Sequence, residues 1–264
     1  MPTLEANGID VYYERSGNGP PLLFVNGSMS TLEHTRPMVE VYAARFDVIA
    51  HDQRGLGKTS IPPGPYTMAD YAGDALSLLD RLGIDRFRMV GTSFGGMVAQ
   101  EIAVTAPERI ERMALLCTSS GGEGGASYPL HTLRDLSPQE ARARSMKLMD
   151  SRFDEEWLAT HPLDRLLTEG MASRATTEEG SEAARGEREQ LEARKGHDVW
   201  DRLSRVGCPT LVAAGRYDGI APPANGEAIA SQIPNAELRV YEGGHAFFAQ
   251  DKGAFPEIME FLSA

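Results

Sequence analysis

The first 118 residues alternate between short apolar runs and amphipathic segments. Continuous apolar runs are typical of strands buried on both faces of a parallel sheet, whereas the first run alternates like a half-exposed strand. The expected strands of this part are 8–15, 20–27, 46–52, 87–91 and 112–118. Helical patterns lie between them, so the pattern predicts an α/β fold with a mostly parallel sheet flanked by helices.

Two helices in this part are well marked. Residues 67–83 place apolar side chains on one face, begin with Thr67 and Asp70 spaced as a capping box, and end at Gly83. The second helix is expected over 94–105. After 197 the alternation resumes, with strands at 209–215 and 236–244 and helices at 223–233 and 254–262.

The segment between these two parts has a different character. It opens with a loop rich in glycine and serine at 119–127, and up to about residue 197 it is charged, helical in pattern and without a clear strand. Ser137, Pro138 and Glu140 start one helix there with a capping box, and 181–196 is a second candidate. We therefore expect an α/β core formed by 1–121 and 198–264, interrupted by a helical cap at 122–197.

Composition narrows the possible partners. The chain has 264 residues, of which 41% are hydrophobic and 24% charged, and its formal charge is −12. A nucleic-acid partner or an anionic membrane surface would need a basic face, which this acidic chain does not supply, so neither is expected. No apolar run has membrane-spanning length. The start of the chain has no secretory-signal pattern, so a cytoplasmic protein acting on a small molecule is expected. The sequence does not determine whether it forms a homo-oligomer.

The two cysteines each lie in or beside an apolar run. Cys117 ends the run at 112–118, and Cys208 precedes the run at 209–215. Free buried thiols are the first expectation. A disulfide stays open as an alternative, because the two strands could be neighbours.

Residues 91–95 contain the most specific chemical signal. Gly-Thr-Ser-Phe-Gly matches G-x-S-x-G, and it follows an expected strand and precedes an expected helix. In that setting a sharp turn raises Ser93 above the sheet edge, and larger side chains at 91 and 95 would collide. The helix start supplies free N–H groups for a developing negative charge. Ser93 is therefore the candidate nucleophile.

A serine nucleophile needs a base, and two later residues have suitable positions. Asp218 and His245 each follow an expected strand, so they should meet Ser93 at the carboxyl edge of the sheet. Their order after the serine also fits. Glu123, which follows the preceding strand, is the alternative acid. No spacing typical of a metal site is present, so neither a metal nor a cofactor is expected.

These pieces together resemble the α/β-hydrolase superfamily, and within it the enol-lactonase and esterase-like branch. The resemblance is carried by GTSFGG, HDQRGLGKTS, GRYDGIAP and GGHAFFAQD, with the cap inserted between strands. It implies a Ser93–His245–Asp218 triad. It also implies an oxyanion hole made by the N–H of Phe94 and that of Ser28, with Met29 as the alternative donor; the Ser28 hydroxyl could assist or bond its own backbone. Asn26 stands where many relatives have histidine.

The resemblance favours a serine hydrolase that cleaves a carboxylic ester or lactone through an acyl-enzyme. Dehalogenases and epoxide hydrolases of this fold carry aspartate at the nucleophile position. The alternatives are a carbon–carbon hydrolase of a ring-cleavage product, although Ala246 stands where those enzymes usually have tryptophan, and a binding protein without catalysis. We expect a small or medium apolar, uncharged substrate, contacted by Asn26, Met29, Trp157 and Phe247.

Overall fold

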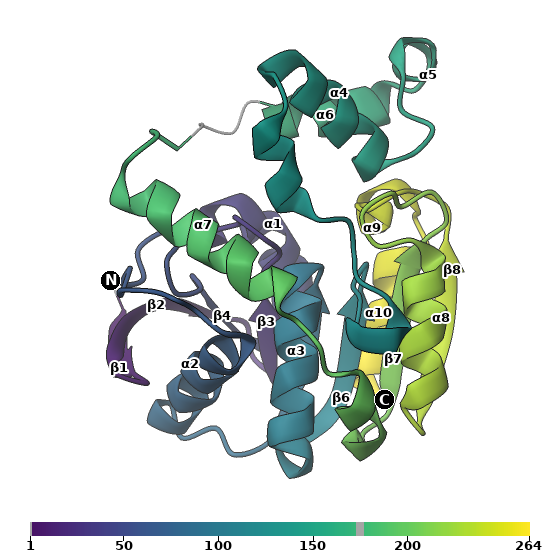
Figure 1. Ribbon diagram of the computed structural model, residues 1–264. Coiled ribbons are helices and arrows are strands. Elements are labelled where there is room, and N and C mark those ends of the chain that lie inside the picture. The colour runs from purple at the N-terminus through teal and green to yellow at the C-terminus, as the bar shows by residue number, and fades with distance from the viewer. Residues whose placement is uncertain (1, 173–176) are drawn as a thin grey trace.

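The computed structural model describes residues 2–172 and 177–264 and contains one eight-stranded sheet (Figure 1). The strand order is β1-β2-β4-β3-β5-β6-β7-β8; β1–β2 and β2–β4 pair antiparallel, and all other neighbours are parallel. The strands are β1 (Thr3–Ala6), β2 (Ile9–Ser16), β3 (Pro21–Val25), β4 (Asp47–His51), β5 (Phe87–Thr92), β6 (Ile110–Leu116), β7 (Thr210–Gly215) and β8 (Ala236–Tyr241). The parallel strands all end at one edge, where the site is built.

Helices cover both faces of the sheet. In Figure 1, α2 (Met68–Arg81), α3 (Phe94–Thr105) and α8 (Pro223–Gln232) lie in front of it. On the other face are α1 (Leu32–Ala43), α9 (Phe247–Gln250) and α10 (Ala254–Ser263). Each layer buries its own apolar cluster against the sheet, which explains why the strands between them are continuous apolar runs.

The segment between β6 and β7 is helical. It contains α4 (Pro138–Met149), α5 (Glu155–Thr160), α6 (Pro162–Ala172) and α7 (Glu182–Lys195). Short 3₁₀ helices are η1 (Pro107–Arg109), η2 (Gly122–Gly124), η3 (Leu130–Asp135) and η4 (Trp200–Arg205). In Figure 1, α4, α5 and α6 stand above the sheet edge, while α7 crosses in front of the core.

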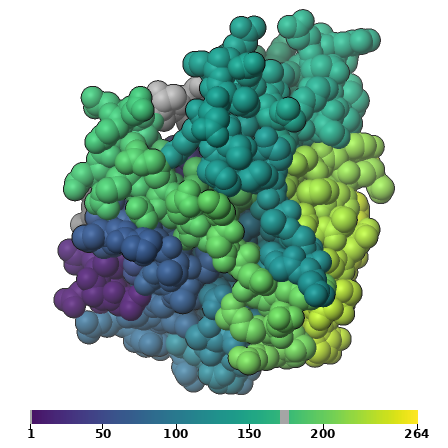
Figure 2. All heavy atoms as spheres, viewed as in Figure 1, coloured from purple at the N-terminus to yellow at the C-terminus, as the bar shows by residue number. Residues whose placement is uncertain are grey.

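Helix α7 packs tightly on the core. A Cβ on Gly186 would overlap the carbonyl oxygen of Gly55, so the two backbones touch. Gln190 and Arg194 on the same helix are also buried. On the face shown in Figure 2, the end of α7 and η4 lie against the chain that follows β6. The expected cap is therefore two structural parts, one standing over the edge and one covering the core; residues 173–176 of it lie outside the described part.

The structure agrees with most expected elements and adds some. The helix expected at 67–83 is α2, and its capping box forms, because Thr67 and Asp70 exchange hydrogen bonds. Strand β1 and helices α5 and α9 were not predicted because each has only four to six residues, whereas α6 was covered only by the general expectation of a helical cap. Cys117 and Cys208 are free and buried. No helix in residues 2–172 and 177–264 is both long and apolar enough to cross a membrane.

Candidate active site

Ser93 lies in the turn between β5 and α3 and has a strained backbone. Its φ of 56° and ψ of −115° are unusual for a residue with a side chain, and such a conformation costs about 1–3 kcal/mol. Two hydrogen bonds hold it. The Ser93 N–H donates to Leu116 O at 2.8 Å, and the Thr118 hydroxyl donates to Ser93 O at 2.8 Å. Both partners belong to β6 and its end, so the neighbouring strand fixes the turn.

The glycines around Ser93 are required by space. A Cβ on Gly91 would overlap the carbonyl of Gly95, and a Cβ on Gly95 would overlap that of Val25. A Cβ on Gly96 would come within 2.6 Å of the Thr118 side chain. The turn therefore has no room for a side chain at positions 91 and 95, and Gly96 lets α3 approach the end of β6.

Ser93, His245 and Asp218 form a continuous hydrogen-bonded chain. His245 Nε2 lies 2.9 Å from Ser93 Oγ, and Nδ1 lies 2.8 Å from Asp218 Oδ2. For Nε2 to accept from the serine hydroxyl, the ring must carry its proton on Nδ1, from which it donates to Asp218. Asp218 Oδ1 accepts two backbone N–H groups, from Ile220 at 2.7 Å and Ala221 at 2.9 Å.

The three groups are nearly enclosed. The side chain of Asp218 is fully buried, the ring of His245 is 11% exposed, and Ser93 is 8% exposed. Low exposure strengthens the interactions among them. Glu123, the alternative acid, is exposed on η2, and the carboxylate that bonds His245 belongs to Asp218.

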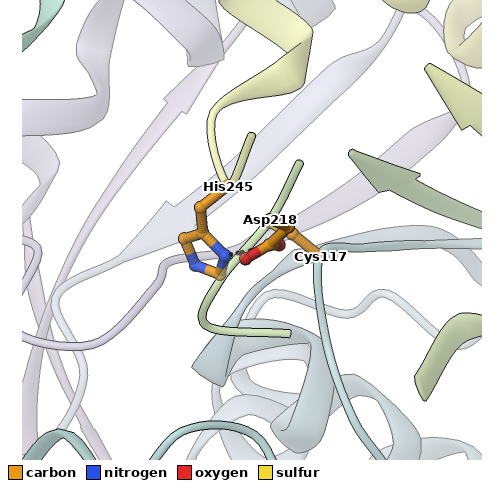
Figure 3. Close-up of side chains that lie close together, drawn as sticks. All are labelled: Cys117, Asp218 and His245. Atoms are coloured by element: carbon orange, nitrogen blue, oxygen red, sulfur yellow. Dashed lines mark hydrogen bonds and ion pairs between the residues drawn. The ribbon is translucent and has the colours of Figure 1, made fainter. Parts of the chain in front are cut away.

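Cys117 lies beside this chain (Figure 3). Its Sγ, a carboxylate oxygen of Asp218 and a ring nitrogen of His245 lie within 4.8 Å of one another. These are metal-ligand types, but Asp218 already accepts from His245 and two backbone N–H groups. Burial, and then the Asp218 charge, raise the pKa of the Cys117 thiol well above its usual value, so it stays protonated. The cluster therefore fits a hydrogen-bonded site better than a metal site.

The end of α4 is bonded to the two loops that carry Asp218 and His245. Leu148 O accepts from Gly219 N–H at 2.9 Å, and Met149 O accepts from His245 N–H at 2.6 Å. Ser151 N–H donates to the Tyr217 carbonyl at 2.9 Å. We call residues 148–151 the clasp, because this short piece of the inserted segment ties the Asp218 loop to the His245 loop.

Gln250 extends the clasp with side-chain contacts. Its Oε1 accepts from Gly244 N–H at 2.8 Å, and its Nε2 donates to Asp150 and Asp164, at 3.0 Å each. Asp150 is fully buried and pairs with Arg152 at 2.6 Å. A glutamine five positions after His245 therefore fixes the loop of that histidine to two carboxylates of the inserted segment.

The loop after β3 approaches Ser93. A Cβ on Gly27 would lie 3.6 Å from Ser93 Cβ. Within residues 2–172 and 177–264, the N–H groups of Phe94 and Ser28 make no hydrogen bond, and the Ser28 hydroxyl is buried without a partner. Met29 N–H is occupied, because it donates to Gln190 Oε1 at 2.7 Å. The two free N–H groups are those expected for an oxyanion hole, whereas the alternative donor is already used.

Two of the expected substrate contacts are wrong in this structure. Asn26 is fully buried, and its side-chain oxygen accepts the Thr35 hydroxyl at 2.8 Å, so it organises the loop from beneath. Phe247 is also fully buried, because its ring stacks on Tyr241 in the core.

The other two expected substrate contacts, Trp157 and Met29, have different surroundings. Trp157 stacks on His161 at 3.7 Å and donates to Asp164 at 2.8 Å, so it serves packing within the inserted segment. Met29 is 38% exposed beside the site, and its role in binding stays a prediction.

Sequence reasoning missed Thr118, Gln190 and the clasp. Thr118 directly follows Cys117 at the end of β6, so its place at the sheet edge was a usable signal. Gln190 bonds a residue 161 positions away, and Gln250 bonds two carboxylates 100 and 86 positions away, so no local sequence pattern indicates these pairings.

Comparison with known proteins agrees with the fold described above. Residues 20–252 match the family described as alpha/beta hydrolase fold. The chain therefore belongs to the alpha/beta hydrolase family.

Its relatives place it near the enol-lactonase-like branch. The chain is 27% identical to 3-oxoadipate enol-lactonase 2 of Acinetobacter baylyi, with 98% of this chain and 94% of that one covered. It is 28% identical to a protein of Azorhizobium caulinodans that bears the name carbamate hydrolase RutD, over 98% and 97%. The enol-lactonase structure from Burkholderia xenovorans LB400 superposes with a TM-score of 0.80 over 100% of both chains, at 23% identity, and shows the shared fold.

Proposed function

We propose that this protein is a serine hydrolase that cleaves a carboxylic ester or lactone through an acyl-enzyme on Ser93. The observation that carries the proposal is the hydrogen-bonded chain Ser93–His245–Asp218, with distances of 2.9 Å and 2.8 Å. A free serine hydroxyl is a weak nucleophile, and a base at this distance activates it.

The chemistry follows from the atoms. Ser93 Oγ attacks the carbonyl carbon while His245 Nε2 takes its proton, and the same proton then passes to the leaving alkoxide. Asp218 keeps the ring proton on Nδ1 and stabilises the imidazolium as it forms. Water attacks the acyl-enzyme by the same route in reverse, which releases the acid and restores the serine.

The oxygen of the tetrahedral intermediate needs preorganised donors. The N–H groups of Phe94 and Ser28 are unbonded and flank Ser93, so we assign them to this task. Loss of one such donor typically lowers kcat by about 10²–10³. Gln190 holds the Met29 N–H, and by doing so it fixes the loop in the arrangement that leaves Ser28 free.

The test combines labelling and turnover. A fluorophosphonate probe should label the wild-type protein and not Ser93→Ala, and p-nitrophenyl butyrate and a γ-lactone should be hydrolysed by wild type alone. Ser120→Ala is the matched control, because Ser120 is a buried serine just after β6 and should leave both activities intact. A folded wild-type protein that neither reacts with the probe nor hydrolyses any ester, lactone or carbamate would overturn the proposal in favour of a ligand-binding role.

A further inference from the structure

Arg194 is a buried cation whose hydrogen bonds go to neutral oxygens. It lies near the end of α7 and is 6% exposed. Its guanidinium donates to Tyr128 O at 2.9 Å and to Ser127 Oγ at 2.6 Å, and its Nε–H is buried without a partner among the described residues. Burial lowers the pKa of Arg194 to about 10, so the group stays charged at neutral pH.

Two other arginines of this protein are used differently. Arg54 binds Asp74 through two hydrogen bonds of 2.7 Å, and Arg202 binds Glu101 at 2.7 Å and 2.8 Å. In both pairs a carboxylate compensates the guanidinium. A buried charge held by neutral groups costs stability, and an apolar side chain of similar length would fill the space without that cost. The contacts of Arg194 therefore point to a role other than packing.

The two oxygens that Arg194 binds flank one peptide bond in the loop after β6 (Figure 2). Ser127 Oγ belongs to the residue before this bond and Tyr128 O to the residue after it, so the guanidinium holds both ends of the link. The N–H of the same bond belongs to Tyr128, and it donates to Ile220 O at 2.7 Å. Arg194 thus fixes the direction in which this N–H points.

The Tyr128 N–H acts on a peptide bond that holds Asp218. Ile220 O is the carbonyl of the bond between residues 220 and 221, and the N–H of that bond, which belongs to Ala221, donates to Asp218 Oδ1 at 2.9 Å. A hydrogen bond accepted by one end of a polar group strengthens the bond that its other end donates. The loop after β6 therefore orients and strengthens a donor to the carboxylate of Asp218.

Two further contacts hold the same loop. Ser127 N–H donates to Ser119 Oγ at 3.1 Å, and the Asn225 side chain on α8 donates to Gly125 O at 3.2 Å. Both bonds come before the link between residues 127 and 128, so they hold the loop without setting the direction of the Tyr128 N–H. Removal of the arginine should therefore displace this N–H while the rest of the loop stays in place.

We propose that Arg194 is a positioning residue for Asp218. It acts through Tyr128 and Ile220, and it keeps the carboxylate turned so that Oδ2 meets His245 Nδ1. The proposal rests on the proposed function, because that function makes Asp218 the acid of the triad. Gln190, which bonds the Met29 N–H, lies four positions earlier on the same side of α7, so this side braces both the oxyanion loop and the acid.

The first test measures the reactivity of Ser93. Arg194→Met keeps the length of the side chain but removes its charge and its hydrogen bonds. The rate constant of fluorophosphonate labelling and kcat for p-nitrophenyl esters should both fall by about 10-fold, because a 1 Å misplacement costs roughly 10²-fold and a smaller one costs less. KM should change little, and Arg194→Lys should restore part of the rate. A loss that lies in KM, or that differs between acetate and butyrate esters, would assign Arg194 to substrate binding and overturn the proposal.

The matched control is Arg185→Met on the same helix. Arg185 also donates to two backbone carbonyls, those of Pro62 and Ile61, so the substitution removes similar contacts away from the loop after β6. It should leave the labelling rate and kcat unchanged, and an equal loss would overturn the proposal. Ser127→Ala removes one of the two bonds of Arg194 and serves in the same tests if Arg194→Met does not fold.

A double-mutant comparison tests whether the effect passes through Asp218. In an Asp218→Asn background, Arg194→Met should not slow labelling further, because the carboxylate that it positions is gone. The same loss in both backgrounds would mean that Arg194 acts on the fold in general, and would overturn the proposal.

A spectroscopic test separates this proposal from the proposed function. The proton between His245 Nδ1 and Asp218 Oδ2 gives a downfield proton NMR signal that requires no turnover, and its loss in Asp218→Asn assigns it. Arg194→Met should shift this signal, and Arg185→Met should not. A shift in a protein that hydrolyses no ester would support the positioning role although the proposed function had failed. An unchanged signal in a folded Arg194→Met protein would overturn the proposal.

Discussion

The two sides of the candidate site are held in place by different parts of the molecule. Ser93 is fixed by the sheet, through backbone and hydroxyl contacts to β6 and close packing against the loop after β3. His245 and the loop of Asp218 are fixed by the inserted segment, through the carbonyls of Met149 and Leu148. The proposed nucleophile therefore depends on the core, whereas the proposed base depends on how the inserted segment is seated.

Because of this difference, changes in the sheet and changes in the clasp should have different effects. A change in the sheet should alter folding and catalysis together, because Ser93 cannot be displaced without the core. A change in the clasp should alter the position of His245 while the fold persists, because the clasp bonds loops at the edge of the sheet. Four substitutions or conditions test this separation.

The largest effect is expected at Asp218, on the side of the site that carries His245. Asp218→Asn should lower kcat for p-nitrophenyl butyrate by about 10⁴ while the protein stays folded, because the amide favours the wrong ring tautomer. Glu123→Gln is the control and should retain wild-type kcat. The assignment of the acid would be reversed if Glu123→Gln were the inactive variant.

On the nucleophile side, Gly95→Ala should damage the fold itself. The new Cβ would overlap the Val25 carbonyl, and overpacking of this kind is expected to cost about 3 kcal/mol of unfolding free energy. Urea denaturation measures it, with Gly170→Ala as control, since a Cβ at this exposed position of α6 meets open space. A Gly95→Ala protein of wild-type stability would show that the turn is looser than described.

Acid should weaken the fold beneath the site through two buried histidines, His51 at the end of β4 and His197 just after α7. Burial lowers the pKa of each to about 4, below 6.5 for an unperturbed side chain. Between these values the unfolded chain binds protons that the native state does not. The stability that neutral burial supports is therefore fully present above pH 6.5 and falls toward pH 4, by about 3 kcal/mol for each histidine.

Urea denaturation at several pH values between 7 and 4 measures this loss. The His51→Gln variant should lose less stability than wild type over that range, whatever its stability at pH 7. Parallel curves for the two proteins would exclude His51 as a source of the acid sensitivity.

The smallest effect is expected at the clasp. Gln250→Met keeps the size of the side chain but removes its bonds to Gly244, Asp150 and Asp164, so His245 should shift. A displacement of about 1 Å costs roughly 10²-fold in rate, and we expect kcat to fall by about 10–100-fold with little change in KM. Gln139→Met, at an exposed glutamine of α4, is the control. A fall in melting temperature without a fall in kcat would assign Gln250 to folding alone.

The sequence was informative where structure is local or periodic. The turn at Ser93 is set by glycines within three residues of it, and Asp218 and His245 follow strands whose apolar runs are unmistakable. The fold class and the meeting of these three residues could therefore be predicted. The sequence could not decide between the N–H groups of Ser28 and Met29 as the second donor. The Met29 N–H is occupied by Gln190, which is distant in the chain.

Other features depend on long-range packing and could not be predicted. Phe247 was expected at the site because it follows His245 closely, but the helix α9 that begins there turns the ring onto Tyr241, where it is fully buried. The burial of Arg194 likewise appears only when α7 is seated on the core.

The clasp also limits how this enzyme scaffold can be recombined. An inserted segment taken from a relative would supply backbone carbonyls at positions 148 and 149 whatever its residues, so the direct contacts to Gly219 and His245 are transferable. The carboxylate of Asp150 is not, because Gln250 in the core is matched to it. A chimera would therefore need to exchange residue 250 together with the segment, because positions 150 and 250, which are 100 residues apart, must match each other.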